Sequence, residues 1–203
     1  SVAVLFALSQ ELVQCANNDT AQLRHYTRFP TLWPAAIAAR PPADGKPMPV
    51  DLALYQPDIA NNTGTLIRLG ACLGTTIHLI HPAGFPFSPK SLARAGLDYV
   101  DHASVQEHAS WTAFDAWRRE AGRRLVLLST KATISAYSVA YRADDILMVG
   151  RESAGVPDAV AAAAELRIRI PMREGLRSIN VALAATLILG EAKRQTDGFT
   201  ALT

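Results

Sequence analysis

Short apolar runs alternate with amphipathic stretches from residue 50 to the end of the chain. The apolar runs are four to six residues long, which is typical of strands buried in a sheet. They predict strands over Val50–Tyr55, Thr76–Ile80, Leu125–Leu128, Ile146–Val149 and Leu166–Ile170. The stretches between them predict helices over Thr63–Leu73, Ser88–Ala95, Glu107–Ala121, Pro157–Ala164 and Ser178–Gln195. This alternation predicts an α/β domain with a mostly parallel sheet.

The first 47 residues do not follow this alternation. They are rich in proline and end in the run Arg40–Pro47, which is typical of a linker. We therefore expect residues 1–47 to be a poorly ordered N-terminal extension and residues 48–203 to form the folded domain. The alternative is that a short helix over Leu5–Cys15 packs on that domain.

Composition and charge narrow the class of protein only in part. The chain is 49% hydrophobic and 19% charged, which is typical of a globular protein. Its net charge of +2 does not indicate a nucleic-acid partner. No apolar run reaches the roughly 18 residues of a membrane span. The two cysteines form no CxxC pair, which favours the reducing cytoplasm over a disulfide framework.

Several common site motifs are absent from the sequence. There is no GxGxxG after the first strand, no GxxxxGK[ST] and no HExxH, so a Rossmann dinucleotide site, a P-loop and that zinc motif are not indicated. The stretch Gly150–Gly155 lacks the spacing of a GxSxG nucleophile elbow. We expect His78 and His81 to be structural, because a metal site needs three or four converging ligands. We therefore expect no metal.

The segment Asn61–Arg68 is the first of three that carry candidate chemistry. It follows the first predicted strand, and we expect Asn62 to cap a helix whose first turn holds Gly64. Arg68 then lies on the same helix face as Gly64. Free backbone N–H groups and a guanidinium at this place suit a phosphate or a ribose. The alternative is an ordinary arginine on a surface helix.

The second and third segments each follow a predicted strand. In the second, Gly150 and Gly155 permit close approach of the backbone to a ligand, and Glu152 between them is expected to be an acid at the site. In the third, Ser178 and Asn180 stand at the start of the last helix, where side chains and free amides can hold a polar ligand. The apolar content of that helix predicts either central core or a subunit interface.

In their order and spacing, these segments resemble the motifs of the SpoU (TrmH) branch of the SPOUT methyltransferases. The likeness is greatest to the TrmL-like (YibK-like) tRNA wobble-position enzymes. The matching stretches are Pro57–Arg68, Gly84–Phe85, Arg94–Tyr99, Gly150–Pro157 and Ile170–Asn180. One departure is arginine after the first glycine of the fourth stretch, where many relatives have proline.

The resemblance extends over residues 48–197 and implies a SPOUT-type α/β fold whose C-terminal segment forms a deep trefoil knot. It implies a homodimer that binds S-adenosylmethionine in the knot and methylates a ribose 2′-hydroxyl at tRNA position 34. By motif position, the cofactor contacts are Leu128, Gly150, Ile170 and Ser178. The functional positions are Asn62, Arg68, Glu152 and Asn180, with Arg68 as the group that activates the hydroxyl.

Contacts with RNA and with a second copy are also expected. Lys90, Arg94, Arg173 and Arg177 are candidates for a phosphate-binding patch across a dimer, although each is also compatible with an ordinary solvated charge. The helix Ser178–Gln195 is the candidate dimer interface. Three aromatic residues at helical spacing are expected to pack in the core rather than stack on bases, namely Trp111, Phe114 and Trp117.

Two other functions remain open from the sequence. A SpoU-branch 2′-O-methyltransferase for rRNA or for another tRNA position would carry the same motifs. A knotted protein that binds RNA without transferring a methyl group would share the fold. Retention of the four functional positions argues against this second alternative.

Overall fold

The computed structural model describes residues 49–87, 102–200 and 202. In this part of the chain, a seven-stranded sheet has the order β3-β2-β1-β6-β4-β7-β5, and every pair of neighbours is parallel. The strands are β1 (Asp51–Tyr55), β2 (Ile77–Ile80), β3 (Val105–His108), β4 (Leu125–Leu128), β5 (Ile134–Ser135), β6 (Ile146–Val149) and β7 (Leu166–Arg169). The predicted α/β fold with a mostly parallel sheet is confirmed.

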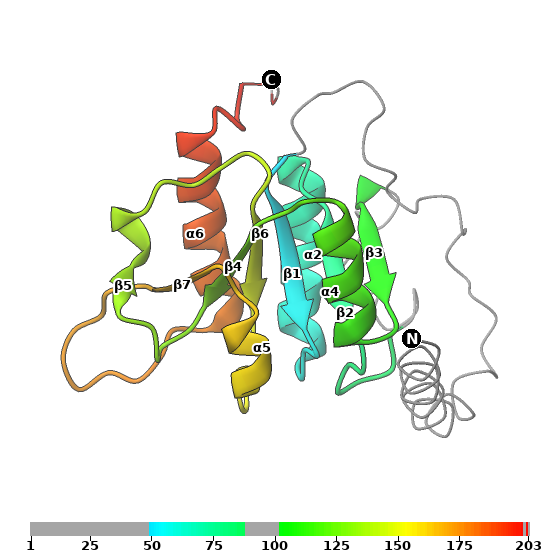
Figure 1. Cartoon of the computed structure of the whole chain (residues 1–203), viewed down its shortest axis with the longest axis horizontal. Coiled ribbons are helices and arrows are strands. Elements are labelled where there is room, and N and C mark those ends of the chain that lie inside the picture. Colours follow the sequence, from blue (N-terminus) through cyan, green and yellow to red (C-terminus); the bar gives the residue numbers. More distant parts are fainter. Residues whose placement is uncertain (1–48, 88–101, 201, 203) are drawn as a thin grey trace, which may run out of the picture. The chain divides into compact units, whose positions relative to one another are not determined.

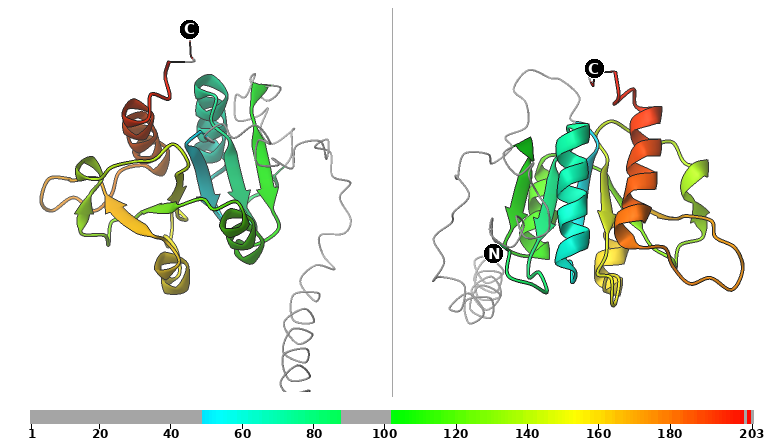
Figure 2. Two further views of the ribbon diagram at one scale, coloured as in Figure 1. Left: turned by 45° about the horizontal axis from the view of Figure 1, so that its top comes forward. Right: turned by 180° about the vertical axis from the view of Figure 1, so that it is seen from behind.

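Helices cover both faces of the sheet. On one face lie α2 (Ala60–Leu73) and α6 (Val181–Gln195), which pack against each other. On the other lie α4 (Trp111–Glu120) and α5 (Asp158–Ala162), as Figures 1 and 2 show. Two-sided cover explains why β1 and β6 are buried along their whole length. No helix among the described residues is long and apolar enough to span a membrane.

The core beneath α4 and α5 is built around one aromatic residue. Phe114 of α4 is fully buried and packs with Leu127, Met148 and Val160. Trp111 and Trp117 pack against this cluster from its edge. The expectation that these three aromatic residues of α4 belong to the core is confirmed.

The sequence pattern misplaced the start of α4 and missed two strands. Glu107 and His108 end strand β3, and α4 begins only at Trp111. Ser110 ends the strand-to-helix turn, because its hydroxyl accepts a hydrogen bond from the Ala113 amide at 3.2 Å. β3 and β5 were missed because β3 is an edge strand with few apolar residues and β5 has only two residues.

Three other helix starts also differ from expectation. α2 begins at Ala60 after Ile59, so the expectation that Asn62 caps this helix is wrong. α6 begins after Asn180 rather than at Ser178. Pro157 occupies the position before α5 instead of its first turn. The expected helix over Ser88–Ala95 and the expected N-terminal extension lie outside the described residues.

A buried polar cluster lies beside the α4 core, at β1, β2 and β3. His78 Nδ1 is 3.1 Å from His108 Nε2, and His78 Nε2 is 3.3 Å from Asp51 Oδ2. Arg123 pairs with the same carboxylate. His78 thus has a structural role, as expected, while His81 pairs with Glu107 nearer the surface at 2.7 Å.

This cluster predicts acid sensitivity of the fold. Burial is the largest cause that lowers the pKa of His108, to about 3. In the unfolded chain His108 becomes protonated near pH 6.5, whereas in the folded protein it stays neutral down to about pH 3. The free energy of unfolding should therefore fall by about 1.4 kcal/mol per pH unit from this group as pH drops below 6.5.

Urea denaturation at pH 7.5, 6.5, 5.5 and 4.5 measures this dependence. His108→Gln should flatten the decline below pH 6.5, even if it lowers stability at pH 7.5. The matched control is His102→Gln, which changes an exposed histidine and should leave the decline unaltered. Equal pH dependence in the His108 variant and the wild type would contradict the assignment.

Candidate active site

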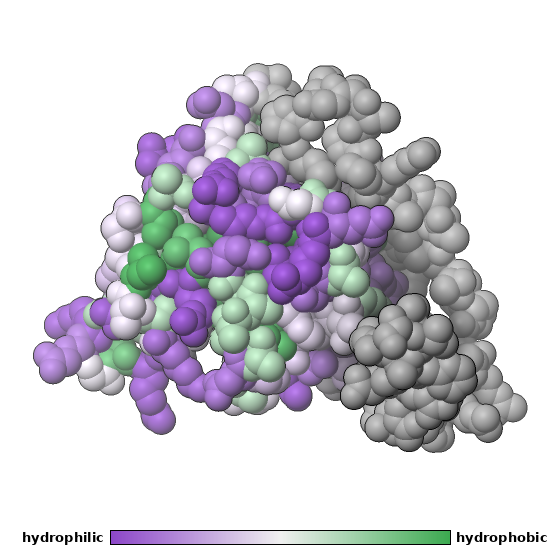
Figure 3. All heavy atoms as spheres, in the orientation of Figure 1, coloured by the Kyte–Doolittle hydropathy of each residue, from purple (hydrophilic) through white to green (hydrophobic). Residues whose placement is uncertain are grey.

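A cleft of about 1210 Å³ opens at the carboxyl edge of the sheet. The segments that follow β4, β6 and β7 form its walls, with Ile59 and Asn62 from the region after β1. The carboxyl ends of parallel strands are the usual place for ligand sites in such folds. Figure 3 shows the molecule hollowed between α5 and the segment that follows β7, with hydrophilic side chains along that segment.

The cleft gathers most of the residues that the sequence singled out. All four expected cofactor positions line it, namely Leu128, Gly150, Ile170 and Ser178. So do three of the four functional positions and two of the four RNA candidates, namely Asn62, Glu152, Asn180, Arg173 and Arg177. Arg68 is not among the lining residues and is exposed on α2. Lys90 and Arg94 lie outside the described residues.

A chain of hydrogen bonds joins the three motif segments at the cleft. The Asn62 amide donates to Glu152 Oε1 at 3.0 Å, and the Asn180 amide donates to Asn62 Oδ1 at 3.1 Å. Glu152 Oε2 accepts from the backbone N–H of Asp58 at 2.8 Å. Glu152 is half-buried and lines the cleft, so its carboxylate does not lie on a fully solvated face.

Asn180 connects this chain to the start of α6. Its Oδ1 accepts hydrogen bonds from the Ala182 and Leu183 amides at 2.9 and 3.3 Å, which satisfies two free donors of the helix. The amide nitrogen is then left to donate to Asn62. A single asparagine therefore fixes the end of the cleft and the geometry of the first motif together.

Asp58 lies beside the cleft and holds its Arg151–Ser153 wall, a contact that the sequence pattern did not indicate. Its carboxylate accepts from Arg151 Nη2 at 2.7 Å and Nε at 3.1 Å, and from the amide and hydroxyl of Ser153. The hydrogen bond from Arg151 is the first cause that lowers the pKa of Asp58, to about 2. The positive charge of Arg151 is thus paired. A polar residue just beyond a parallel strand was the signal that could have identified Asp58.

Gly150 is required by the loop itself. The backbones of Arg151 and Gly155 exchange two hydrogen bonds, at 3.0 and 2.9 Å, which fold residues 150–155 tightly. A Cβ on Gly150 would lie 2.6 Å from the carbonyl carbon of Gly155. The close approach predicted for this glycine is therefore to Gly155. Gly155 has a φ of 69°, a conformation that favours glycine.

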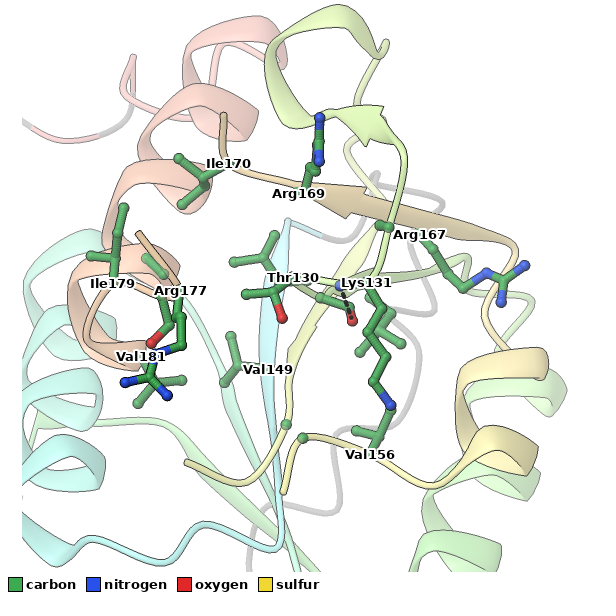
Figure 4. Close-up of a pocket in the computed structure, with 18 of the residues that line it drawn as sticks. Thr130, Lys131, Val149, Val156, Arg167, Arg169, Ile170, Arg177, Ile179 and Val181 are labelled. Atoms are coloured by element: carbon green, nitrogen blue, oxygen red, sulfur yellow. Dashed lines mark hydrogen bonds between the residues drawn. The ribbon is translucent and has the colours of Figure 1, made fainter. Parts of the chain in front are cut away.

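The cleft is lined by both apolar and polar side chains. Apolar side chains on several strands and loops line it, including Leu127, Leu128, Val149, Val156 and Ile170. Figure 4 shows Val149 and Ile170 within the site and basic side chains around it. Apolar surface beside fixed polar groups suits a small organic ligand with polar ends. In the described part of the chain, no group of three or more His, Cys, Asp or Glu is placed to hold a metal ion.

Comparison with known proteins gives this site a family. A family model described as the SpoU rRNA Methylase family matches residues 49–190. The chain is 54% identical over 152 residues to a tRNA (cytidine(34)-2′-O)-methyltransferase of Ancylobacter novellus, covering 75% of this chain and 96% of the relative. Identity is 58% over 144 residues to the enzyme of the same name from Beijerinckia indica subsp. indica, covering 71% and 90%.

Solved structures agree with the family match. One described as "Structural insights into the 2-OH methylation of C/U34 on tRNA" has a TM-score of 0.67 and 40% identity, covering 74% of this chain and 97% of that one. An AdoMet-bound rRNA methyltransferase from Sinorhizobium meliloti has a TM-score of 0.67 and 28% identity, covering 73% and 57%. The protein belongs to the SpoU methylase family.

Proposed function

We propose that this protein is a tRNA methyltransferase that uses S-adenosylmethionine to methylate the ribose 2′-hydroxyl of the wobble nucleotide, position 34. The observation that carries the proposal is the hydrogen-bonded chain of Asn62, Glu152 and Asn180 at the mouth of one cleft. Relatives more than half identical over most of their length are named for this reaction on cytidine 34. We place the protein in the cytoplasm, where tRNA is modified.

The cleft fits the cofactor in chemistry and size. Its volume of about 1210 Å³ accommodates a nucleoside with an amino-acid tail. Leu128 and Ile170 supply apolar surface for a base, and Gly150 and Ser178 supply backbone groups and a hydroxyl on the rim. When bound, S-adenosylmethionine supplies a methyl group on a positively charged sulfur. Because Glu152 already holds two hydrogen bonds, its carboxylate is fixed before any ligand enters.

The site residues have two proposed roles, namely to fix the walls of the cleft and to stabilise negative charge on the acceptor oxygen. Asn62 and Asn180 fix Glu152 and the start of α6, so they keep the walls of the cleft in place. We assign Arg68 to the RNA substrate, since it lies outside the cofactor cleft. An arginine guanidinium stays protonated in proteins, so it serves better to orient the 2′-hydroxyl and stabilise negative charge on its oxygen than to accept the proton.

We also propose that the C-terminal part of the fold is threaded as the trefoil knot of the family resemblance. β7 lies between β4 and β5, and residues 170–180 then run along the cleft before α6 begins. Residues 129–133, which follow β4, line the same cleft. A knot requires such a meeting of a C-terminal segment with an earlier loop.

A homodimer through α6 is the remaining part of the proposal. One face of α6 is buried on the sheet, while Leu183 and Leu187 on its other face are 60% and 47% exposed. Leucines four residues apart form a continuous apolar stripe on a helix. Leu176 and Ile179, which precede the helix and line the cleft, are also exposed, at 65% and 37%. A second copy of the same stripe is a self-complementary cover for it.

The double variant Leu183→Asp, Leu187→Asp should therefore be monomeric in light-scattering measurements at a concentration where the wild type is dimeric. Four carboxylates at a two-fold interface would be buried without partners, which costs several kcal/mol. Tyr137→Asp is the matched control, because Tyr137 is 50% exposed and lies outside the stripe. A dimeric double variant would contradict this interface.

Methyl transfer from labelled S-adenosylmethionine to tRNA tests the proposed function. The tRNA comes from cells that lack wobble ribose methylation, and the label is mapped by nuclease digestion. Label on the 2′-oxygen of nucleotide 34 is expected. Label on rRNA or at another tRNA position would support methyl transfer to RNA but assign a different substrate or position. Bound cofactor and bound tRNA without transfer would indicate an RNA-binding protein instead.

A further inference from the structure

Among the described arginines, ion pairs with carboxylates are more frequent away from the cleft than on it, although Arg142, outside the cleft, forms none. Away from it, five arginines form ion pairs with carboxylates, namely Arg118, Arg119, Arg123, Arg124 and Arg194. On the cleft, Arg151 is paired with Asp58. The side chains of the other cleft-lining basic residues form no ion pair with the described residues, namely Lys131, Arg167, Arg169, Arg173 and Arg177.

Acidic residues on the cleft do not offset this surplus. Glu152 is held by Asp58 and Asn62, and Glu165 is held by Arg118 and the Leu125 amide. The other acidic lining residues are Asp158 and Glu174. Hydrogen bonds from neutral groups do not cancel the charge of Glu152, so within the described part of the chain three lining carboxylates without a cationic partner face five unpaired cations. The cleft therefore keeps a net positive charge.

Strand β7 is the unusual element in this distribution. It reads Leu-Arg-Ile-Arg, and only Ile168 is buried. Arg167 and Arg169 lie two residues apart and so share one face of the sheet. Arg167 is in register with Leu127, whose side chain packs in the core beneath α4 and α5. That face is covered by helices over β1, β6 and β4, but over β7 it carries two exposed arginines.

Parallel strands are normally apolar on both faces because helices cover them. Two exposed arginines on an inner strand therefore give up the stability that a buried leucine or valine would supply at the same positions. Contact with a ligand would offset this loss. Figure 4 shows Arg167 and Arg169 projecting from β7 and Lys131 near Val156, with Arg177 on the opposite side of the site. The two groups of cations thus flank the cleft.

We propose that Lys131, Arg167 and Arg169, the β7 cationic strip, bind the sugar–phosphate backbone of the RNA substrate next to the reacting nucleotide. The inference rests on the proposed function and adds contacts beyond Arg173 and Arg177. Arginine and lysine facing solvent suit phosphates at regular spacing, and such contacts position a nucleic acid without reading its sequence. With cations on both sides of the cleft, the strand carrying the target ribose is held across its opening.

Fluorescence anisotropy of labelled tRNA against salt concentration tests the strip. The test variant carries Arg167→Gln and Arg169→Gln. The matched control carries Arg119→Gln and Arg142→Gln, which remove the same charge from exposed positions outside the cleft. We expect the test variant to bind tRNA about tenfold more weakly at 100 mM salt, with a salt slope smaller by about 1.4. Adding Lys131→Gln should weaken binding further.

Two further readouts distinguish a contact with RNA from damage to the cofactor site. S-adenosylmethionine affinity should stay within twofold of wild type, and KM for tRNA should rise while kcat at saturating tRNA is kept. Equal tRNA affinity and salt slope in the test and control variants would contradict the proposal that the β7 cationic strip binds RNA. So would a loss of cofactor affinity with unchanged tRNA affinity. Methyl transfer by the wild type tests the proposed function separately. Failure of the β7 cationic strip can therefore be distinguished from failure of the proposed function.

Discussion

Replacing Arg68 by alanine should lower kcat for methyl transfer by about 10²–10³-fold, the usual cost of removing a group that stabilises charge in a transition state. Affinity for S-adenosylmethionine should stay within twofold, because Arg68 does not line the cleft. The fold should be retained, since this side chain is exposed on α2. Single-turnover transfer to tRNA and calorimetric titration of the cofactor measure the two quantities separately.

Arg142→Ala is the matched control for this variant. It removes an exposed arginine outside the cleft and should leave both transfer and cofactor affinity unchanged. Unchanged turnover in Arg68→Ala would remove this residue from the mechanism. Loss of cofactor affinity together with transfer would assign Arg68 to the cofactor instead of the RNA.

Gly150→Ala should weaken S-adenosylmethionine binding and lower the rate of methyl transfer by about 10²-fold, because a shift of roughly 1 Å in reacting groups can have that cost in rate. The added Cβ would meet three backbone atoms of Gly155 at 2.6 to 2.9 Å. Backbone atoms cannot turn aside as a side chain would, so the paired backbones of Arg151 and Gly155 must separate. The whole loop lines the cleft and would move with them.

A second variant that also adds one heavy atom, but outside the cleft, controls for general effects of a substitution on folding and binding. Ala116→Ser adds one heavy atom at an exposed position of α4, outside the cleft, and should bind the cofactor like wild type. Circular dichroism should show that Gly150→Ala keeps its helices and strands, since the clash is confined to one loop. Wild-type cofactor affinity in Gly150→Ala would contradict the role of this loop.

The sequence predicted most of the sheet because its inner strands are continuous apolar runs. β1, β4 and β6 were placed within one residue, since burial on both faces leaves no polar position in the pattern apart from Asp51. β3 was not predicted because an edge strand needs apolar residues on one face only, and its Val-Gln-Glu-His sequence reads equally well as the start of a helix. β5 is too short to form a pattern.

The sequence indicated the segments that meet at the cleft but not the hydrogen bonds between them. Asn62, Glu152 and Asn180 came from motif positions, and the hydrogen bonds between them join residues 90 and 118 positions apart. No local pattern encodes a contact at that separation. Asp58 was missed for the same reason, since its partners Arg151 and Ser153 are more than 90 residues away.

Methyl transfer to two tRNA transcripts that differ in a single atom tests the central claim most directly. One carries cytidine at position 34 and the other 2′-deoxycytidine, so the second lacks only the hydroxyl oxygen that we propose to be methylated. We predict stoichiometric transfer to the first and none to the second, with comparable binding of both. Equal transfer to the two transcripts would contradict the assignment of the ribose 2′-hydroxyl at position 34 as the acceptor.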